Sequence, residues 1–392
     1  MKSKIVKGFS IMCASLMVMS ALVGCGSEKK GEEVIKIGGN FPMTGGVASV
    51  GQSANSAIKM AIDQANANGG LLGKKIEFVL ADNKSEPSEA MNAMQKLIGQ
   101  DKVVGVIGPI ISSSAIASGE LSNKSKIVTI SPMATNPSVT VDKNGQTKPY
   151  MFRACFIDPF QGTVMAKFVR NNLKAKNVAI MIDNSSDYSK GLAKYFKQGF
   201  ELTGGKVIAE ESFFQKDTDF KATLTKIKAQ NPDMIYIPAY YQEVGLIIKQ
   251  ARELGLTVPI AGGDGWDSNK LPEIAGKDAL NHTYFSSLYS ADDVSADSKA
   301  NKVFVDEYKK LYGQKPDVFA ALGYDSVNLL IKAIENAKST DGEKIKASLE
   351  ATSDFNGVSG SVKFDEYHNP VKDAVIIEFK DGKQEFNTKV SA

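Results

Sequence analysis

The stretch "VVGVIGPIISSSA" (103–115) decides the fold class of this chain. Its first part, "VVGVIG" (103–108), is apolar on consecutive residues, as strands are when helices cover both faces of a parallel sheet. A proline follows, and the three serines Ser112 to Ser114 stand where a helix can begin. A buried strand, a short loop and a helix form the repeating unit of α/β proteins.

The same alternation continues on both sides of this stretch. The other predicted strands are VIKIGG (34–39), KIEFVLAD (75–82), KIVTIS (126–131), NVAIMID (177–183), KVIAEESF (206–213), MIYIPA (234–239) and VPIAGG (258–263). Helical spacing separates them, most clearly at Ala54, Ala57, Ile58, Ala61, Ile62 and Ala65, and at Val244, Ile247, Ile248, Ala251 and Leu254. These residues recur at i, i+3, i+4 and i+7, which predicts helices with one apolar face. The predicted class is α/β.

The strand–helix series restarts near "MFRACFIDPFQG" (151–162), which predicts two doubly wound lobes. Two helices, at about 297–312 and 317–338, and β segments near 361–366 and 373–380 then break the rhythm. The spacing leaves open which lobe takes those segments. With them in the second lobe, the expected boundaries are 34–153 with 286–360 for lobe 1, and 154–285 with 361–392 for lobe 2.

The first 24 residues are predicted to be a signal sequence. Three lysines precede "FSIMCASLMVMSALVG" (9–24), an apolar run too short for a comfortable membrane span. The run ends in "LVGC" (22–25), which resembles a bacterial lipoprotein signal. That resemblance implies lipidation of Cys25, a tether over 25–33, and attachment to the outer face of the cytoplasmic membrane. An ordinary signal peptide or a short anchor helix is the alternative.

Charge and cysteine content exclude several classes of protein. The chain has 47 Lys+Arg and 44 Asp+Glu, and loss of the three signal lysines leaves 44 of each. A near-neutral protein gives no indication of nucleic-acid binding. With Cys13 cleaved off and Cys25 lipidated, Cys155 stands alone, so an intramolecular disulfide is excluded and stability must come from core burial.

Enzyme signatures are missing from the sequence. The two histidines, His282 and His368, have no metal-ligand neighbour at a recognisable spacing and are expected to be surface or packing residues. "GQSAN" (51–55) lacks the second glycine of a nucleophile elbow, and "GGLLGKK" (69–75) is not a phosphate-binding loop. We therefore expect a protein that is not an enzyme and has no cofactor or metal.

Polar residues gather where the predicted strands end. They are Ser112 to Ser114, Thr135, Tyr188, Tyr240 with Tyr241, and Asp264. Ligands of open α/β sheets bind outside the carboxyl ends of the strands, so two lobes that face each other would share one cleft. Serines at a helix start suit an anion, and an aspartate in a glycine-rich loop suits a cation. A plain helix N-cap, a turn aspartate and packing of the tyrosines under a helix are the alternatives.

Six stretches together resemble a known family. They are VVGVIGPIISSSA (103–115), ISPMATNP (130–137), DNSSDYSKGLAKYF (183–196), KDTDFKATLTKIK (216–228), IPAYYQEVGLIIKQARELG (237–255) and GGDGWD (262–267). They are similar to the leucine/isoleucine/valine-binding proteins of ABC transporters, from about Val34 to the C-terminus. The resemblance implies two Rossmann-like lobes, joined by three crossovers, that close on an amino acid.

The resemblance also implies roles for single residues. Ser112 would bind the ligand carboxylate, and Thr135 would contact both the carboxylate and the ammonium. The backbone of Met133 and Ala134 would line the site, with the Met133 carbonyl facing the ammonium. Asp264 would pair with the ammonium and Tyr240 would close over the α-substituents. The side-chain pocket would be lined by Tyr188 and Phe319.

Two departures from the family bear on the ligand. The acid of the "GGDG" loop is often glutamate, so Asp264 reaches one methylene less, and Val50 stands where an aromatic residue is common. The expected function is a monomeric, lipid-anchored binding component of an ABC importer for leucine, isoleucine or valine, with permease subunits and their ATPases as partners. A short amide, urea or another amino acid is the alternative ligand. A sensor ectodomain and an enzyme are the alternative classes.

Overall fold

The computed structural model describes residues 33–292, 299–353 and 355–390. By its internal contacts the chain divides after Glu33, and everything below concerns the unit that starts at Val34. The predicted signal sequence, the lipidation of Cys25 and nearly all of the tether therefore lie outside the described residues. No helix in the described ranges is both long enough and apolar enough to cross a membrane.

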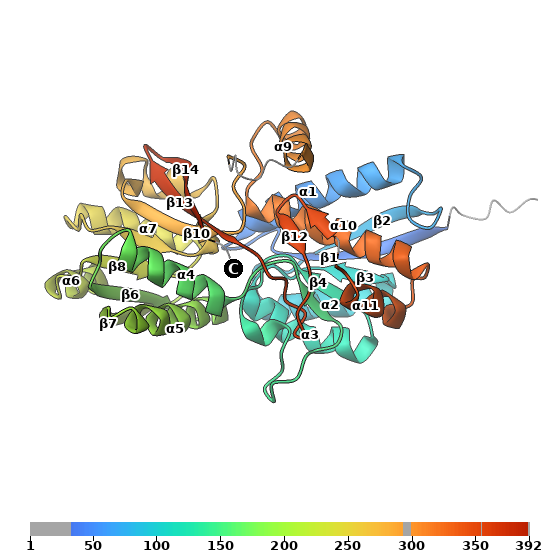
Figure 1. The fold of residues 1–392 in the computed structure, drawn as a ribbon, viewed down its shortest axis with the longest axis horizontal. Coiled ribbons are helices and arrows are strands. Elements are labelled where there is room, and N and C mark those ends of the chain that lie inside the picture. Colours follow the sequence, from blue (N-terminus) through green and yellow to red (C-terminus); the bar gives the residue numbers. More distant parts are fainter. Residues whose placement is uncertain (1–32, 293–298, 354, 391–392) are drawn as a thin grey trace, which may run out of the picture. The chain divides into compact units, whose positions relative to one another are not determined.

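The first sheet has the strand order β2-β1-β3-β4-β5, and all of its strand pairs are parallel (Figure 1). Its strands are β1 (Val34–Phe41), β2 (Lys75–Asp82), β3 (Gly105–Ile107), β4 (Val128–Ser131) and β5 (Met151–Arg153). This is a doubly wound order in which the chain reverses direction next to β1, so the strand ends of β1 and β3 flank a crevice.

The second sheet repeats that order and then extends it. Its strand order is β7-β6-β8-β9-β10-β13-β14. The strands β6 to β10 are parallel, β13 is antiparallel to β10, and β14 is antiparallel to β13. The strands are β6 (Asn177–Asp183), β7 (Lys206–Phe213), β8 (Met234–Ile237), β9 (Ile260–Gly262), β10 (Thr283–Ser287), β13 (Ala374–Lys380) and β14 (Lys383–Val390). The C-terminal strands thus join the second sheet.

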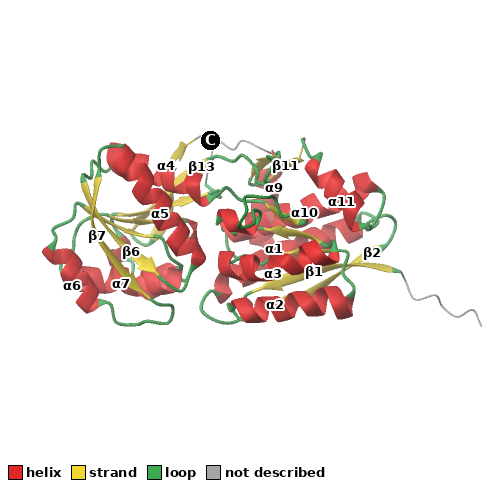
Figure 2. Cartoon of the chain, turned by 90° about the horizontal axis from the view of Figure 1, so that it is seen from below, coloured by secondary structure: helices red, strands yellow, loops and turns green. Residues whose placement is uncertain are grey.

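Helices cover both faces of the sheets (Figure 2). The helices are α1 (Ala48–Ala67), α2 (Pro87–Lys96), α3 (Ser112–Ser125), α4 (Asp158–Asn171), α5 (Asp187–Leu202), α6 (Lys221–Ala229), α7 (Tyr241–Glu253), α8 (Leu271–Ala275), α9 (Lys299–Tyr312), α10 (Val318–Ala337) and α11 (Gly342–Glu350). In the first lobe α1 packs against α10 and α2 against α3; in the second, α4 packs against α5 and α7 against α8. The predicted α/β class with two doubly wound lobes is confirmed.

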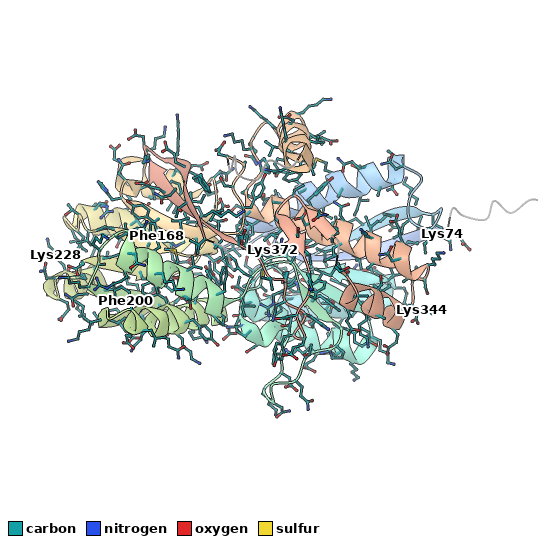
Figure 3. The ribbon with its side chains drawn as sticks, viewed as in Figure 1. Lys74, Phe168, Phe200, Lys228, Lys344 and Lys372 are labelled. Carbon is teal, nitrogen blue, oxygen red and sulfur yellow. The ribbon has the colours of Figure 1, made fainter. Side chains whose placement is uncertain are left out.

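The chain passes between the two sheets three times, and residues 293–298 of the second passage lie outside the described ranges. It leaves the first sheet after Arg153, returns beyond Ser287 to α10, and enters the second sheet again at Ala374. The third connection carries Lys372, which is buried and donates to the backbone oxygen and hydroxyl of Ser359 at 3.1 and 2.9 Å. In the view of Figure 3, Lys372 lies near the middle of the molecule, whereas Lys74, Lys228 and Lys344 lie towards its edges.

The structure corrects the strand predictions at β5, β10, β14 and the segment near 361–366. β5, β10 and β14 were not predicted, because β5 (MFR) and β10 (TYFSS) contain no run of consecutive aliphatic residues and β14 is a polar edge strand with alternating exposure. The β segment expected near 361–366 is shorter, since β12 (Gly360–Val362) pairs only with β11 (Phe355–Gly357). Beyond it, Phe364 and Pro370 form an isolated bridge that turns the chain back on itself.

Candidate ligand-binding site

Five of the residues singled out in the sequence lie at carboxyl ends of strands, as expected. Ser112 opens α3 after β3, Thr135 follows β4, Tyr188 lies in the first turn of α5 after β6, Tyr240 precedes α7, and Asp264 opens the short 3-10 turn η3 (Asp264–Trp266) after β9. None of them is more than 6% exposed. A set of polar side chains from both lobes is therefore removed from bulk solvent.

Asp264 is held in place by two donors from its own lobe. Its Oδ1 accepts hydrogen bonds from the Tyr188 hydroxyl at 2.7 Å and from Gln161 Nε2 at 2.9 Å. Gln161 also donates to the hydroxyl of Ser286, on β10, at 3.0 Å. Burial raises the pKa of Asp264 to about 6, although the bonds from Tyr188 and Gln161 act in the opposite direction. The carboxylate is thus oriented before any ligand arrives.

The glycines of the "GGDG" loop permit this arrangement. A Cβ on Gly263 would lie 2.5 Å from the Tyr188 hydroxyl, and one on Gly265 would lie 2.8 Å from the backbone oxygen of Ala239. Side chains at these positions would therefore push Tyr188 away from Asp264. The close packing around Asp264 therefore requires glycine at both of these positions.

Aromatic residues surround Asp264. The rings of Tyr188 and Tyr240 lie 5.2 Å apart at an interplanar angle of 35°. Burial, followed by the charge of Asp264, raises the pKa of both hydroxyls well above the ordinary value, so they stay neutral and available as donors. Tyr236, on β8, was not predicted; its ring stacks on Phe196 with centroids 3.8 Å apart, and its hydroxyl is buried.

A second buried carboxylate, Asp158, was missed in the sequence. It is the first residue of α4, fully buried, and its backbone N–H donates to the Thr135 oxygen at 3.0 Å. Burial raises the pKa of Asp158 to about 8, with the Thr135 hydroxyl lowering it, Asp264 raising it and Arg153 lowering it. Aspartate is ordinary in the first turn of a helix. Only the fold places Asp158 beside Thr135, so "DPFQG" alone gave no signal.

Several buried polar atoms around the two carboxylates have no hydrogen-bond partner within the described protein. They are Gln161 Oε1, the Tyr236 hydroxyl, Thr135 Oγ1 and both carboxylate oxygens of Asp158. The Thr135 hydroxyl lies near enough to Asp158 to act on its pKa, but the two groups form no hydrogen bond of good geometry. Buried polar groups in native proteins are almost always hydrogen-bonded, and a cluster of exceptions calls for an explanation. A small ligand with several polar groups, one of them cationic, satisfies these atoms and compensates the two acids.

The serine run does not cap its helix. Ile111 occupies the N-cap position of α3 and makes no side-chain cap, so the plain N-cap alternative is wrong. The hydroxyl of Ser112 instead accepts from the backbone N–H of Asn136 at 3.3 Å. The Ser112 N–H lies close enough to the Tyr240 hydroxyl to act on its pKa. The Ser112 N–H, at the start of α3, thus lies beside a residue of the second lobe.

Contacts between the lobes enclose the site. The Ser113 hydroxyl accepts from the Asp187 N–H at 3.0 Å, and Asn136 Nδ2 donates to the Asp187 oxygen at 2.8 Å. At the rim, Lys216 Nζ pairs with Glu86 Oε1 at 2.8 Å. A small cavity of about 70 Å³ beside Tyr240 remains under this rim. In the described form, the two lobes are therefore closed over the polar residues of the candidate site.

The remaining predicted residues lie near the same loops. Met133 and Ala134 are buried in the loop after β4, and the Ala134 N–H donates to the Ser131 hydroxyl at 3.2 Å. Phe319 is buried in the first turn of α10, and Val50 in that of α1. Across the described ranges, no hydrogen bond or ring pair joins Phe319 to Tyr188, Tyr240 or Asp264.

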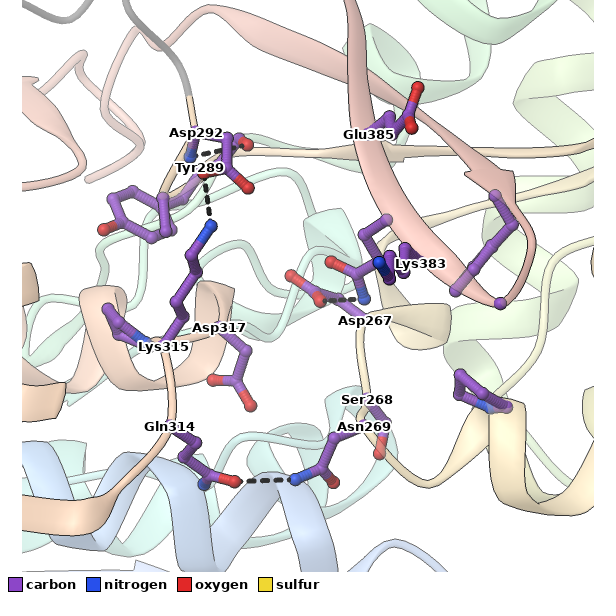
Figure 4. Close-up of a pocket in the computed structure, with 17 residues that line it drawn as sticks. Asp267, Ser268, Asn269, Tyr289, Asp292, Gln314, Lys315, Asp317, Lys383 and Glu385 are labelled. Carbon is purple, nitrogen blue, oxygen red and sulfur yellow. Dashed lines mark hydrogen bonds and ion pairs between the residues drawn. The ribbon is translucent and has the colours of Figure 1, made fainter. Parts of the chain in front are cut away.

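A larger cavity of about 580 Å³ lies elsewhere and contains none of the predicted ligand residues (Figure 4). Asp267 and Asp317 face it, and both carboxylates are already satisfied by the chain. Asp267 accepts from the Val318 N–H at 3.0 Å and from Gln384 Nε2 at 2.9 Å, and Asp317 caps α10 through the Ala320 N–H at 2.8 Å. The unsatisfied polar atoms favour the strand ends as the candidate site.

Two doubly wound lobes that close over buried polar groups define a two-lobed small-molecule binding protein. The sequence pattern of the periplasmic binding protein family matches residues 34–384. The chain belongs to this family, in its branch of leucine/isoleucine/valine-binding proteins, which are extracytoplasmic solute-binding components of ABC transporters and not enzymes.

Known relatives support that placement. The Leu/Ile/Val-binding protein BraC3 of Rhizobium johnstonii is 33% identical over 85% of this chain and 88% of the relative. A leucine-binding protein from Thermotoga maritima superposes with a TM-score of 0.86 at 38% identity, covering 91% of this chain and 99% of the other. A branched-chain amino acid transporter substrate-binding protein from Streptococcus pneumoniae, in complex with isoleucine, gives 0.85 at 38% identity, covering 92% and 99%.

A more distant structure carries another kind of ligand. A solute-binding protein of an R. palustris ABC transporter, in complex with benzoate, has a TM-score of 0.80 at 25% identity, covering 92% of this chain and 98% of the other. The fold alone therefore does not select the ligand, and the selection has to be argued from the side chains of the site.

Proposed function

We propose that this protein binds leucine, isoleucine or valine between its lobes and delivers the amino acid to the permease of an ABC importer. The observation that carries the proposal is the pair of buried carboxylates, Asp158 and Asp264, among polar atoms without partners. Two acids in a desolvated site favour a ligand with a cationic group and disfavour one that carries only a carboxylate, such as benzoate.

Each predicted residue has a place in this proposal. Asp264 pairs with the ligand ammonium. Asp158, which was not among the residues predicted from the sequence, pairs with it from the other side. The N–H groups at the start of α3, with Ser112 and Thr135, hold the carboxylate. The Met133 oxygen also faces the ammonium, with Ala134 beside it. Tyr240 closes over the α-substituents, and the aliphatic side chain would then lie between Tyr188 and Phe319.

Binding to a panel of small molecules tests the ligand assignment. Purified protein is titrated by calorimetry with leucine, isoleucine, valine, alanine, acetamide, urea and benzoate, after release of any co-purified ligand. The proposal expects saturable binding of at least one branched-chain amino acid and none of benzoate. Tighter binding of acetamide or urea than of all the amino acids would contradict it and favour the amide alternative.

We also propose the anchoring expected from the sequence and revised lobe boundaries. Cys25 is lipidated after removal of residues 1–24, and residues 25–33 tether the protein to the outer face of the cytoplasmic membrane. The expected boundaries were 34–153 with 286–360 for lobe 1, and 154–285 with 361–392 for lobe 2. Because Ser286 and Ser287 end β10 of the second sheet and β13 begins at Ala374, we propose 34–153 with 288–373 for lobe 1, and 154–287 with 374–392 for lobe 2. In cells, Cys25→Ala should release the protein from the membrane fraction or leave it unprocessed. Membrane retention with normal processing would contradict the anchor.

A further inference from the structure

Arg153 is a buried cation that the ligand site described above does not use. It is the last residue of β5, its side chain is fully buried, and it lies where the chain first leaves the first sheet. In the described ranges no carboxylate pairs with it as a salt bridge. A buried guanidinium without a partnering acid is costly unless neutral acceptors surround it.

The acceptors of Arg153 come from one loop. Nη1 donates to the backbone oxygen of Ala134 at 2.6 Å, and Nη2 donates to those of Asn136 at 3.0 Å and Pro137 at 3.4 Å. Nη2 also donates to the Thr140 hydroxyl at 3.0 Å. One side chain thus fixes the backbone on both sides of Thr135, the residue proposed to contact the ligand. The planar fork of arginine suits such a set of fixed acceptors.

The same contacts reach the connections between the lobes. The Thr140 hydroxyl, which accepts from Arg153, donates to Asn369 Oδ1 at 3.1 Å, and the Arg153 N–H donates to the His368 oxygen at 3.4 Å. His368 stacks on Phe152, the neighbour of Arg153, with ring centroids 3.9 Å apart. The ligand loop, the first connection and the third connection are therefore bonded around one guanidinium.

We infer that Arg153 is a positioning residue for ligand binding, which holds the 134–137 loop in its binding conformation and ties it to the connections between the lobes. This inference rests on the proposed function for its effect on affinity. It does not place Arg153 against the ligand. The positive charge of Arg153 also lowers the pKa of Asp158. Arg153 therefore acts on the site both through the backbone of the loop and through its electrostatic effect on Asp158.

Arg252 provides a matched control in the other lobe. Its side chain also makes four hydrogen bonds, all of them to backbone oxygens, those of Leu256, Val258, Ala279 and Asn281, at 2.6 to 3.2 Å. These loops lead into the amino ends of β9 and β10, whereas Asp264 follows the carboxyl end of β9. Arg252→Lys therefore removes a comparable set of bonds without touching the ligand loop.

Leucine titrations of wild type, Arg153→Lys and Arg252→Lys test the inference. Because lysine cannot reproduce the fork, we expect Arg153→Lys to weaken leucine binding about 10- to 100-fold, the loss of one or two charged hydrogen bonds. Arg252→Lys should bind within about twofold of wild type. In a Thr135→Val background the effect of Arg153→Lys should shrink, since both changes act through the same loop. Equal losses for both arginine variants would overturn the inference.

Hydrogen exchange of the ligand-free proteins gives a second readout that needs no ligand. Arg153→Lys should speed exchange of the amides of 134–139 relative to the rest of the chain, and Arg252→Lys should speed exchange near 256–258 and 279–281 instead. If wild type fails to bind leucine, the proposed function fails, and exchange still decides the role of Arg153. Unchanged exchange at 134–139 in Arg153→Lys would overturn the positioning role.

Discussion

At the scale of single residues, the proposed ligand preference depends on Asp264 and Asp158. Of these two acids, only Asp264 could be predicted from the sequence. Asp264 could be found because its glycine-rich loop follows a predicted strand. Asp158 could not, because an aspartate before a proline at a helix start is common and its neighbours are distant in sequence. Both are buried, with pKa values raised to about 6 and about 8, so their charge state is linked to ligand binding.

Asp264→Asn should weaken leucine binding by about 2–5 kcal/mol, or roughly thirtyfold to several thousandfold. Asparagine keeps the shape but removes the charge that compensates the desolvated ammonium. Ser112→Ala should cost less, because the backbone N–H groups of α3 still hold the carboxylate. Calorimetric titration measures both. Wild-type affinity in Asp264→Asn, together with weak binding in Ser112→Ala, would indicate a ligand without an ammonium at this position.

Leucine affinity should fall as the pH is lowered from about 8 to about 6. The Asp158 carboxyl is mostly neutral at pH 7, and the ligand ammonium favours its ionised form, so binding releases a proton. One released proton gives a change of up to about tenfold in affinity per pH unit. Calorimetry in two buffers with different ionisation enthalpies counts the protons. A pH-independent affinity would show that Asp158 does not contact the ammonium.

The same shift predicts an opposite effect on the ligand-free protein. Because the pKa of Asp158 is higher in the folded state than its ordinary value of 3.8, the folded state binds more protons between that value and about 8. The free energy of unfolding should therefore decrease as the pH rises through this range. Asp158→Asn should reduce this decrease, and it should also remove most of the proton release on binding. Urea unfolding at several pH values provides the check.

At the scale of elements, the strand–helix order was predictable because buried parallel strands are apolar on consecutive residues. The strands that escaped prediction lacked this signal, since β5 (MFR) and β10 (TYFSS) have no run of aliphatic residues and β14 is a polar edge strand. The positions of the ligand loops followed from the strand ends. Their mutual contacts did not, because Asn136 and Asp187, which join the lobes, lie in different parts of the chain.

The contact between α3 and α5 predicts a role for the Ser113 hydroxyl in leucine binding. Ser113 Oγ accepts from the Asp187 N–H across the lobes, so Ser113→Ala leaves a first-turn N–H of α5 without this acceptor in the closed form. We expect leucine binding to weaken by about 0.5–1.5 kcal/mol, the typical net value of one hydrogen bond.

Ser118→Ala is the matched control for Ser113→Ala. The Ser118 hydroxyl also lies in α3, but it is fully buried and donates to the Ser114 oxygen of the same helix at 2.8 Å. Its loss should change the free energy of unfolding and leave leucine affinity near that of wild type. Parallel titrations and urea unfolding of both variants decide the point. If Ser118→Ala weakens binding as much as Ser113→Ala, the contact with α5 does not stabilise the bound form.

At the scale of the whole molecule, the two sheets share one strand order, and the chain connects them three times. The two doubly wound lobes were predicted from the strand–helix series, whereas the three connections were implied by the family resemblance, because periodicity shows that a helix exists but not which sheet it covers. The third connection illustrates the limit. Its β segment was expected near 361–366, whereas the chain forms β12 and then a turn that packs Asn369 against Thr140.

Closure on the ligand is the prediction that belongs to this scale. Ligand contacts from both lobes favour the closed form only when the ligand is present, so the ligand-free protein should populate more open forms by rotation about the connections, among them 151–160 and 280–290. Small-angle scattering should therefore give a smaller radius of gyration with saturating leucine than without it. Asp264→Asn should stay near the ligand-free value at a leucine concentration that saturates wild type but lies well below the weakened Kd of the variant. If wild type binds leucine by calorimetry and its scattering profile is nevertheless unchanged, the site is preformed in the closed state and the contacts of Ser113 and Asn136 with Asp187 do not depend on the ligand.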